Sequence, residues 1–505
     1  MEIALPSYAA NEPAIHRLVD DILAYIFLLN ATIPEHATTV AFSQVCTRWR
    51  SIGLNYHTIW GRIIDYHRHS LKWIETLLDR SNPSLLDFGS RINGVHFTSH
   101  SLAEGVLELV FNHIDRLRIF NLQVPVTSWE LVCSRFLHLP APNLEFVHII
   151  VPANIGHLTH PLFDNHAPNL RSLGLPRDTV DFTSPVLTLL TELYVNNIAN
   201  GSPTVLEWLN ILRGMPSLRW VTLINAISSA PANDICPVVH LRALDMLSLD
   251  GSFLESVTLV DHLIVPPHCG LRFCSYNAHM GFGQQRLWAI IEKNLDSWAK
   301  NAPNRHLEAS VTHGPAGFHV AIENRSCGYG VWSTEAVEVA GGRCSSGSGV
   351  DPVMSITLGL VDILVPEPVE IFLSLFALFE RTFFDTTYLG LCIHCGSAFL
   401  PIVDSLRGFV NLEKLSLEYD TQTDFPFPLL QQANSVILPA LKSIEFFDTE
   451  YGNGPESLRL IADFLQWRRE QGFPVEKLVI FQCENPVDRE YILAHFQDTV
   501  VEIIE

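Results

Sequence analysis

The sequence predicts an α/β fold, in which a small N-terminal helical unit precedes a long, irregular array of parallel strands and helices interrupted by a β-hairpin. Apolar residues recur at helical spacing near the N-terminus, apolar-x-x-apolar-x-apolar segments then return every 20 to 28 residues, and a β-rich stretch breaks that rhythm. A chain of 505 residues exceeds one compact core, so we expect two domains or a repeat array. Their predicted bounds are 12–65 for the helical unit, 66–302 and 361–505 for the array, and 303–360 for the β-rich insertion.

The first predicted helix carries two rows of apolar residues, each with members four apart. The rows are Leu18, Ile22 and Ile26, and beside them Val19, Leu23 and Phe27. One row can fold inward, whereas the other needs something else to cover it. A unit this short is marginal when it stands alone. The wide apolar surface of this helix is therefore predicted to be a docking surface.

The order of these residues resembles the F-box, specifically the F-box-like domain of fungal proteins. The family consensus begins Leu-Pro-x-Glu-Ile-Leu and ends near Val-Cys-x-x-Trp, and residues 18–23 and 45–49 match its two halves. Val19 stands where the family usually has proline, and Asp21 where it usually has glutamate. Valine gives up the fixed φ of proline, while Asp21 keeps a negative charge that suits a helix N-terminus.

This resemblance implies that the N-terminal helices bind the Skp-family adaptor of a Skp–cullin–F-box ubiquitin ligase, and through it a cullin. The residues expected to contact the adaptor are Leu18, Val19, Ile22, Leu23, Phe27, Val45, Cys46 and Trp49. These residues also have a purely structural interpretation. In it, four of them form the core of a helical cap on the array, as solenoids require. Those residues are Leu18, Ile22, Val45 and Trp49, and both interpretations can hold together.

The segments that follow share one short apolar pattern. Five consecutive segments are led by Leu144, Leu170, Leu190, Leu218 and Leu244, and three later ones by Leu412, Leu441 and Val475. Their last two apolar positions alternate as in a strand, and proline-containing pairs upstream end the preceding element. This is the pattern of leucine-rich repeats, here irregular because the usual asparagine is mostly missing. A generic leucine-rich α/β domain is the alternative.

Helices and a hairpin are predicted within and beside this array. Helical spacing is clear over Leu71–Arg80 and over Ser457–Gln471. His306–Thr312 and Phe318–Glu323 predict a β-hairpin, to which 332–339 and 354–360 could add strands, all within an insertion projecting from the solenoid. The glycine-rich loop at 341–349 lacks the Gly-Lys-Ser/Thr ending of a phosphate-binding loop, so we expect a flexible tip.

Composition limits the partners and the compartment. Residues 81–505 carry 25 Lys and Arg against 46 Asp and Glu, out of a net charge of −22 for the chain, which argues against nucleic acid as a partner. No secretory signal is visible, and the longest apolar run, near Val369–Phe379, is too short and too interrupted to span a membrane. Ten scattered cysteines fit a reducing compartment, so the cytoplasm or nucleus is expected.

Few residues suggest chemistry. Cys392 and Cys395 form a Cys-x-x-Cys pair, but no second pair exists at zinc-site spacing, so two packed thiols are expected. We expect His67 and His69 to be surface or repeat-loop residues. We therefore expect no catalytic residue, no metal and no cofactor, although an enzyme built on the insertion or the cysteine pair stays an alternative.

The sequence thus predicts a non-catalytic substrate-recognition subunit, with the repeats presenting an acidic surface to a protein substrate. That substrate is expected to be basic, and its binding residues stay unassigned. A leucine-rich-repeat binding scaffold with no link to a ubiquitin ligase is the alternative function.

Overall fold

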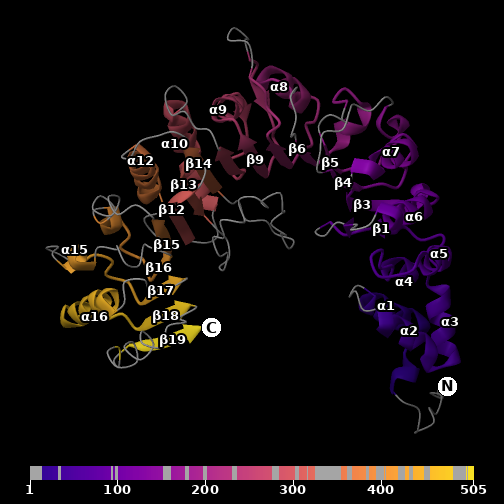
Figure 1. Cartoon of the computed structure of the whole chain (residues 1–505), viewed down its shortest axis with the longest axis horizontal. Coiled ribbons are helices and arrows are strands. Elements are labelled where there is room, and N and C mark those ends of the chain that lie inside the picture. The colour runs from indigo at the N-terminus through magenta and orange to yellow at the C-terminus, as the bar shows by residue number, and fades with distance from the viewer. Residues whose placement is uncertain are drawn as a thin grey trace, which may run out of the picture. The chain divides into compact units, whose positions relative to one another are not determined.

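The structure is a computed structural model (Figure 1). It describes residues 14–31, 36–91, 95–96, 100–124, 126–151, 161–176, 181–196, 202–229, 236–275, 284–301, 306–314, 317–324, 354–360, 367–382, 386–393, 403, 405–418, 427–431, 436–447, 455–481, 496 and 499–504. The chain forms two compact units, Met1–Ala199 and Asn200–Glu505, and the helical segment and the first strands both belong to the first. The four domain bounds expected from the sequence stay predictions.

The first unit opens with short helices. They are α1 (Asp20–Asn30), α2 (His36–Val45), α3 (Thr47–Asn55), α4 (His57–Arg62) and α5 (Leu71–Arg80), after a 3₁₀ turn at Ala14–Arg17. Asp20 and Asp21 lie in the first turn of α1, where negative charge is favourable. The side chain of Ser70 caps α5 by accepting a hydrogen bond from the Trp73 N–H at 3.4 Å. The helix predicted over Leu71–Arg80 is confirmed.

A parallel sheet follows the helices. Its strands are β1 (Leu86–Phe88), β2 (Val95–His96), β3 (Leu117–Gln123), β4 (Phe146–Ile150), β5 (Ser172–Pro176) and β6 (Glu192–Asn196). Both β1 and β2 pair with β3, and each later strand pairs in parallel with the one before it. The connections are helical: α6 (His100–Phe111), α7 (Trp129–Val132), a π-helical turn (Cys133–Leu137) and 3₁₀ turns at Ile114–Arg116, Val126–Ser128, Leu162–Asn165 and Pro185–Leu189.

A buried arginine joins the helices to this sheet. Arg116, 6% exposed, donates from Nε to the Ser84 carbonyl at 2.9 Å, from Nη1 to the Leu78 carbonyl at 3.3 Å and from Nη2 to Ser81 Oγ at 2.7 Å. The end of α5 and the loop before β1 are thereby tied to the start of β3. Burial lowers the pKa of Arg116, but a guanidinium still keeps its proton at neutral pH.

The second unit continues with a longer, mostly parallel sheet. Its strands are β7 (Trp220–Ile224), β9 (Met246–Gly251), β11 (Gly270–Ser275), β14 (Met354–Leu360), β13 (Gly317–Asn324), β12 (His306–Gly314), β15 (Tyr388–Ile393), β16 (Lys414–Glu418), β17 (Ser443–Phe447), β18 (Lys477–Phe481) and β19 (Val500–Ile504), in order of pairing. A small separate pair is formed by β8 (Val239–His240) and β10 (Leu263–Ile264).

Helices connect the strands of this second unit. They are α8 (Val205–Arg213), α9 (Phe253–Asp261), α10 (Gln284–Asn301), α12 (Glu367–Thr382), α15 (Phe427–Gln431) and α16 (Pro455–Glu470), with a 3₁₀ turn at Leu406–Gly408. Figure 1 shows α10, α12, α15 and α16 on one side of the strands. Within the part of the chain that the structure describes, no helix is both long enough and apolar enough to cross a membrane.

The predicted hairpin exists, but it does not project. β12 and β13 pair antiparallel, with Gly314 opposite Gly317 at the turn, and β14 joins β13. β14 also pairs in parallel with β11, and β12 with β15, so the three strands lie inside the sheet. For these three strands, the expectation of a projecting insertion is therefore wrong. Residues 332–339 and the glycine-rich loop 341–349 lie outside the described residues.

The core follows the repeat pattern. In β6, β7 and β9 buried residues alternate with partly exposed ones, and the buried ones are the last two apolar positions of each segment. The eight predicted repeat segments all contain strands, and the helix predicted over Ser457–Gln471 is α16. The architecture is α/β, with a large parallel sheet and helices, and it is consistent with a solenoid-like fold.

Candidate functional site

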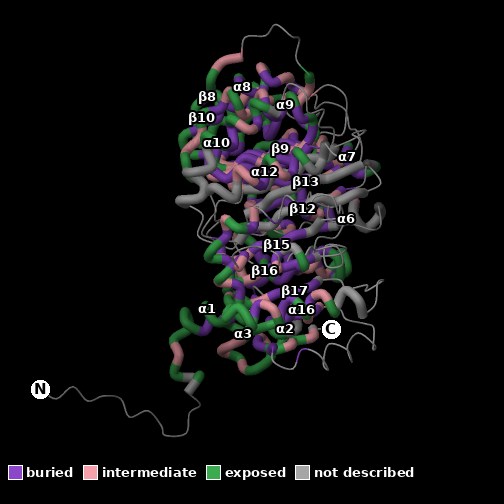
Figure 2. Tube along the Cα trace, turned by 90° about the vertical axis from the view of Figure 1, so that its left-hand side faces the viewer, coloured by how far each residue is buried: buried purple, intermediate pink, exposed green. Residues whose placement is uncertain are grey.

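The first helix exposes an apolar surface, which we call the α1 face. Its members are the large hydrophobic side chains that stay exposed on α1 and just before it, namely Ile15, Val19, Ile22, Tyr25, Ile26 and Leu29. Val19 is 64% exposed and Ile22 48%. Exposed residues dominate the tube along α1 in Figure 2. Val45, at the end of α2, is exposed as well.

The spacing of four members of the α1 face places them together. Residues 19, 22, 26 and 29 are separated by three, four and three positions, so on a helix with 3.6 residues per turn they fall within an arc of roughly 80°. Single exposed hydrophobic residues are normal on a protein surface, but contiguous patches mark interaction sites. The α1 face is such a patch.

The opposite side of α1 is the core of the helical unit. Leu23, Ala24 and Phe27 are buried there. The Phe27 ring stacks on Phe42 of α2 with centroids 3.9 Å apart and meets Trp49 of α3 at 5.1 Å. These contacts fix the side of α1 that faces inward, and therefore the side that faces out.

Two of the predicted adaptor contacts are consequently misplaced. The sequence predicts that Leu23 and Phe27 contact the adaptor, but these side chains are only 0% and 3% exposed. A row at i, i+4 advances about 40° around the helix at each step, so a row that begins at exposed Val19 reaches the buried side by Phe27. The purely structural interpretation is also wrong for Ile22 and Val45, because neither lies in the core.

The other predicted contacts lie at the edge of this core. Leu18, Cys46 and Trp49 are all half-buried. Cys46 caps α3, since its Sγ accepts a hydrogen bond from the Trp49 N–H at 3.5 Å. The Val-Cys-x-x-Trp segment thus builds the support for α1, whereas Val19, Ile22 and Val45 are presented to solvent.

Sequence reasoning missed four members of the α1 face as contact residues. They are Ile15, Tyr25, Ile26 and Leu29. The alternating three-and-four spacing of residues 19, 22, 26 and 29 was the signal that could have found the last two. Nothing in the pattern sets Ile15 and Tyr25 apart from core residues.

A single arginine joins the start of α3 to the start of α1. Arg48 donates from Nε and Nη2 to Asp20 Oδ1 at 2.9 and 2.7 Å, and from Nη2 to the Leu18 carbonyl at 2.5 Å. The ion pair is largely exposed, with side-chain exposures of 34% and 66%, so it contributes little to stability. Its effect is geometric, because it fixes the N-terminal end of the α1 face against α3.

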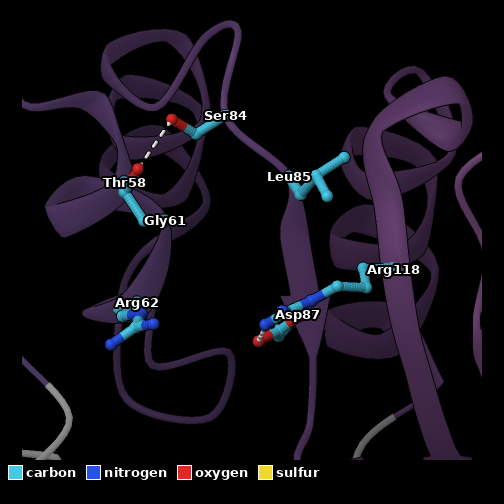
Figure 3. A pocket seen from close by; sticks show the side chains of 7 residues that line it. All are labelled: Thr58, Gly61, Arg62, Ser84, Leu85, Asp87 and Arg118. Carbon is cyan, nitrogen blue, oxygen red and sulfur yellow. Dashed lines mark hydrogen bonds and ion pairs between the residues drawn. The ribbon is translucent and has the colours of Figure 1, made fainter.

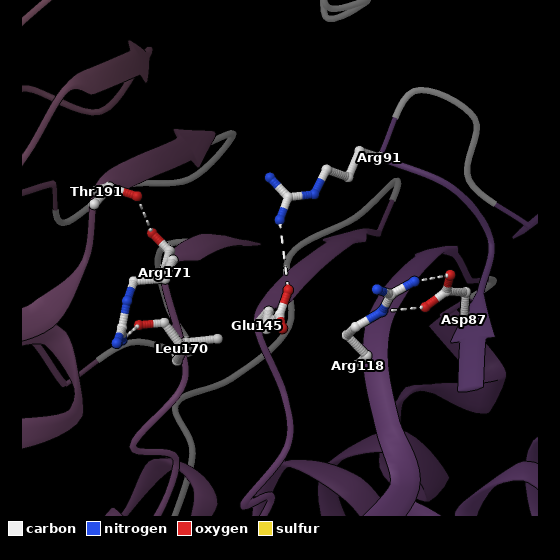
Figure 4. A network of polar contacts seen from close by, with 7 residues as sticks. All are labelled: Asp87, Arg91, Arg118, Glu145, Leu170, Arg171 and Thr191. Carbon is white, nitrogen blue, oxygen red and sulfur yellow. Dashed lines mark hydrogen bonds and ion pairs between the residues drawn. The ribbon is translucent and has the colours of Figure 1, made fainter. Parts of the chain in front are cut away.

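The strand starts of the first unit carry a different set of charges, in which arginines contact carboxylates and backbone carbonyls (Figure 4). Arg118 donates to both carboxylate oxygens of Asp87, at 2.9 and 2.6 Å, and this contact raises the pKa of Arg118. Arg91 lies 3.8 Å from the Glu145 carboxylate, and Arg171 donates to carbonyls of its own turn. These groups mainly link neighbouring strands to one another.

The histidines and cysteines singled out in the sequence are not gathered into a site. The Asp65 carboxylate accepts hydrogen bonds from the backbone N–H groups of His67 and Arg68 at 2.9 and 3.0 Å, and the Asp65 N–H donates to His69 Nδ1 at 3.2 Å. His67 is exposed, but His69 is only 8% exposed, so the expectation that His69 lies on the surface is wrong. Cys392 lies on β15, and Cys395 lies outside the described residues. The described ranges contain no cluster of three or more His, Cys, Asp or Glu side chains that could hold a metal ion.

Two thiols are held protonated. Burial raises the pKa of Cys133 and of Cys269 to about 12, with the charges of Glu130 and Asp245 adding to the effect. A nucleophilic cysteine needs a lowered pKa, so neither thiol is suited to that role.

No family model matches this chain, and no curated protein matches it either.

Proposed function

We propose that this chain is the substrate-recognition subunit of a Skp–cullin–F-box E3 ubiquitin ligase. The α1 face would bind the Skp-family adaptor, and the adaptor would connect the chain to a cullin. The observation that carries the proposal is the α1 face itself, where six large hydrophobic side chains remain exposed on and beside one helix.

The way the motif residues are used supports this assignment. Cys46 caps α3, and Trp49 packs on Phe27, so the residues that resemble the F-box second half hold α1 in place. The residues that resemble its first half supply exposed Val19 and Ile22. The helical unit therefore separates into a supporting part and a presenting part, as a docking module requires.

The parallel-strand array is proposed to bind the protein substrate. The chain would do no bond chemistry of its own and would need no cofactor or metal. It would hold the substrate beside the ubiquitin-charged enzyme, which turns a bimolecular encounter into a local one. We place this activity in the cytoplasm or nucleus, and the net charge of −22 favours a basic substrate surface.

The test is co-purification of the full chain with a Skp-family adaptor. Ile22→Asp puts a charge at the centre of the α1 face and should reduce adaptor capture by about thirtyfold or more, because central apolar contacts are worth at least about 2 kcal/mol. Leu254→Asp on α9 is the matched control, since Leu254 is 49% exposed against 48% for Ile22. It should capture the adaptor as the wild type does, and both variants should keep the wild-type melting temperature.

Two results would contradict the proposal. The first is that the wild-type chain captures no adaptor. The alternative function would then remain, a leucine-rich-repeat binding scaffold without ubiquitin-ligase linkage. Val19 in place of proline is the residue that favours this alternative. The second is equal capture by Ile22→Asp and Leu254→Asp, which would show that the adaptor, if bound, does not use the α1 face. Leu23→Asp is unsuitable as a test, because Leu23 is buried and its loss would unfold the unit.

A further inference from the structure

A cavity of about 220 Å³ lies in the first unit, where α4 meets the first strands (Figure 3). Its lining comes from three places in the chain: Thr58, Gly61 and Arg62 of α4, Ser84 and Leu85 of the following loop, and Asp87 and Arg118 of β1 and β3. None of these residues belongs to the α1 face. The cavity has no role in the function proposed above.

The cavity contains more hydrogen-bond donors than its own acceptors use. Arg62 is exposed, and among the described residues its guanidinium makes no hydrogen bond or ion pair, so its five N–H groups are available. Arg118 donates to Asp87 from Nε and from one N–H of Nη2, so three of its five N–H groups can donate to a ligand. Figure 3 shows Arg62 across the gap from the Asp87–Arg118 pair.

The hydroxyl groups add to this surplus. Thr58 Oγ1 and Ser84 Oγ lie 3.1 Å apart and share one hydrogen bond. Only one of the two hydroxyl hydrogens is consumed by that contact, so the other can donate to a ligand. The only charged acceptor in the lining, the Asp87 carboxylate, already receives two hydrogen bonds from Arg118.

Charge points the same way as hydrogen bonding. Two arginines and one aspartate give the lining a net charge of +1, in a chain whose net charge is −22. Guanidinium groups bind phosphate and carboxylate in bidentate geometry, which makes them the usual partners of these anions. The chemistry that completes this cavity is therefore an oxyanion group.

One wall of the cavity is apolar. Leu85 is 43% exposed beside the polar groups. A free anion would make no use of this side chain, whereas a peptide that carries an anionic group beside an apolar residue would contact both.

We propose that this cavity binds an oxyanion, a phosphate or a carboxylate, carried by a peptide segment of a partner protein. Arg62 and the free N–H groups of Arg118 contact the oxyanion, one hydroxyl of the Thr58–Ser84 pair donates to it, and Leu85 packs on the neighbouring apolar residue. The site does not depend on adaptor binding.

In the experiment, the full chain is titrated with three probes, and ligand-observed NMR measures the binding of each probe. The probes are the capped dipeptides leucyl-phosphoserine and leucyl-glutamate, and inorganic phosphate. Saturable binding by the phosphoserine dipeptide alone identifies a phosphate reader, and binding by both dipeptides identifies a general acidic-peptide site. Both dipeptide results support the proposal. If inorganic phosphate binds with the same affinity as the dipeptides, the proposal is contradicted, because neither Leu85 nor the peptide then contributes to binding.

Three variants decide whether the cavity is the site. Arg62→Ala should weaken dipeptide binding at least about tenfold, because a hydrogen bond to a charged group is lost. Arg68→Ala is the matched control: Arg68 is an exposed arginine of the same unit, paired with Asp65 outside the cavity, and its loss should change nothing. Asp87→Asn should strengthen binding severalfold, because it removes the competing negative charge from Arg118.

The proposal would be overturned by a wild-type chain that binds no probe saturably. It would also be overturned if Arg62→Ala bound as the wild type does, since general attraction to exposed cations would then explain the signal. Weaker binding by Asp87→Asn would also contradict the proposal. It would mean that Asp87 only holds the structure of the cavity and does not compete with the ligand for Arg118. Melting temperatures of all three variants establish that each is folded.

Discussion

At the scale of single residues, Arg116 is the side chain on which the junction between helices and sheet depends. It is buried, and three of its hydrogen bonds go to Ser84, Leu78 and Ser81, which lie on α5 and in the loop that follows it. Arg116→Met keeps much of the volume but leaves buried acceptors unpaired, and each such group costs about 1 to 3 kcal/mol. We expect a loss of about 3 kcal/mol or more in the stability of the first unit, measured by urea unfolding.

The control for this prediction is another arginine of the same unit. The Arg68 side chain is 81% exposed. Arg68→Met should therefore change the free energy of unfolding, measured with urea, by no more than about 0.5 kcal/mol. If Arg116→Met unfolded at the wild-type midpoint, the junction would depend on apolar packing rather than on these hydrogen bonds.

At the scale of elements, the start of α1 explains how valine can stand in the position of proline. Val19 is the residue before the helix, with φ −68° and ψ 156°, and a proline ring fixes φ near −65°. Among the described residues, its N–H donates to no backbone carbonyl. We therefore expect Val19→Pro to be tolerated, with a gain of about 0.4 to 1 kcal/mol from reduced freedom of the unfolded chain.

Val45 provides the matched control for that substitution. It is 59% exposed against 64% for Val19, but it is the last residue of α2, where proline would remove a helix hydrogen bond and clash with the preceding turn. Thermal unfolding should show Val45→Pro destabilised by about 3 kcal/mol and Val19→Pro unchanged or stabilised. A similar loss in both variants would mean that the entry to α1 does not accept proline.

The elements also show what a sequence can and cannot specify. The repeat strands and α5 could be predicted because alternation at period two and spacing near 3.6 are local properties. The outward side of α1 could not, because Phe42 and Trp49 decide it by packing on Phe27. The place of the hairpin could not either, because it depends on pairs such as Arg272 with Ser355, which are far apart in the sequence.

The cavity at α4 was missed for a related reason. Arg62 and Arg118 carry no motif, and 56 positions separate them, so only the fold brings them to one surface. The α1 face, in contrast, lies within one helix, and most of its members could be found from spacing once the inward side was known.

At the scale of the whole molecule, the parallel array predicts local rather than global consequences of damage. In a solenoid-like arrangement each strand is stabilised mainly by its two neighbours. Leu173 of β5 pairs with Val147 and Leu193 in the first unit, and Leu415 of β16 pairs with Leu389 and Ile444 in the second. Both leucines are 1% exposed, so they form a matched pair for testing this property.

Replacing either leucine by alanine should cost about 2 to 5 kcal/mol, from lost burial and the cavity left behind. Hydrogen exchange followed by mass spectrometry should show Leu173→Ala accelerating exchange in β4, β5 and β6 while β16, β17 and β18 keep wild-type rates. Leu415→Ala should give the reverse pattern. If either variant accelerated exchange equally in both sets of strands, the two units would unfold as one cooperative body, and damage in the second unit would then also remove the α1 face.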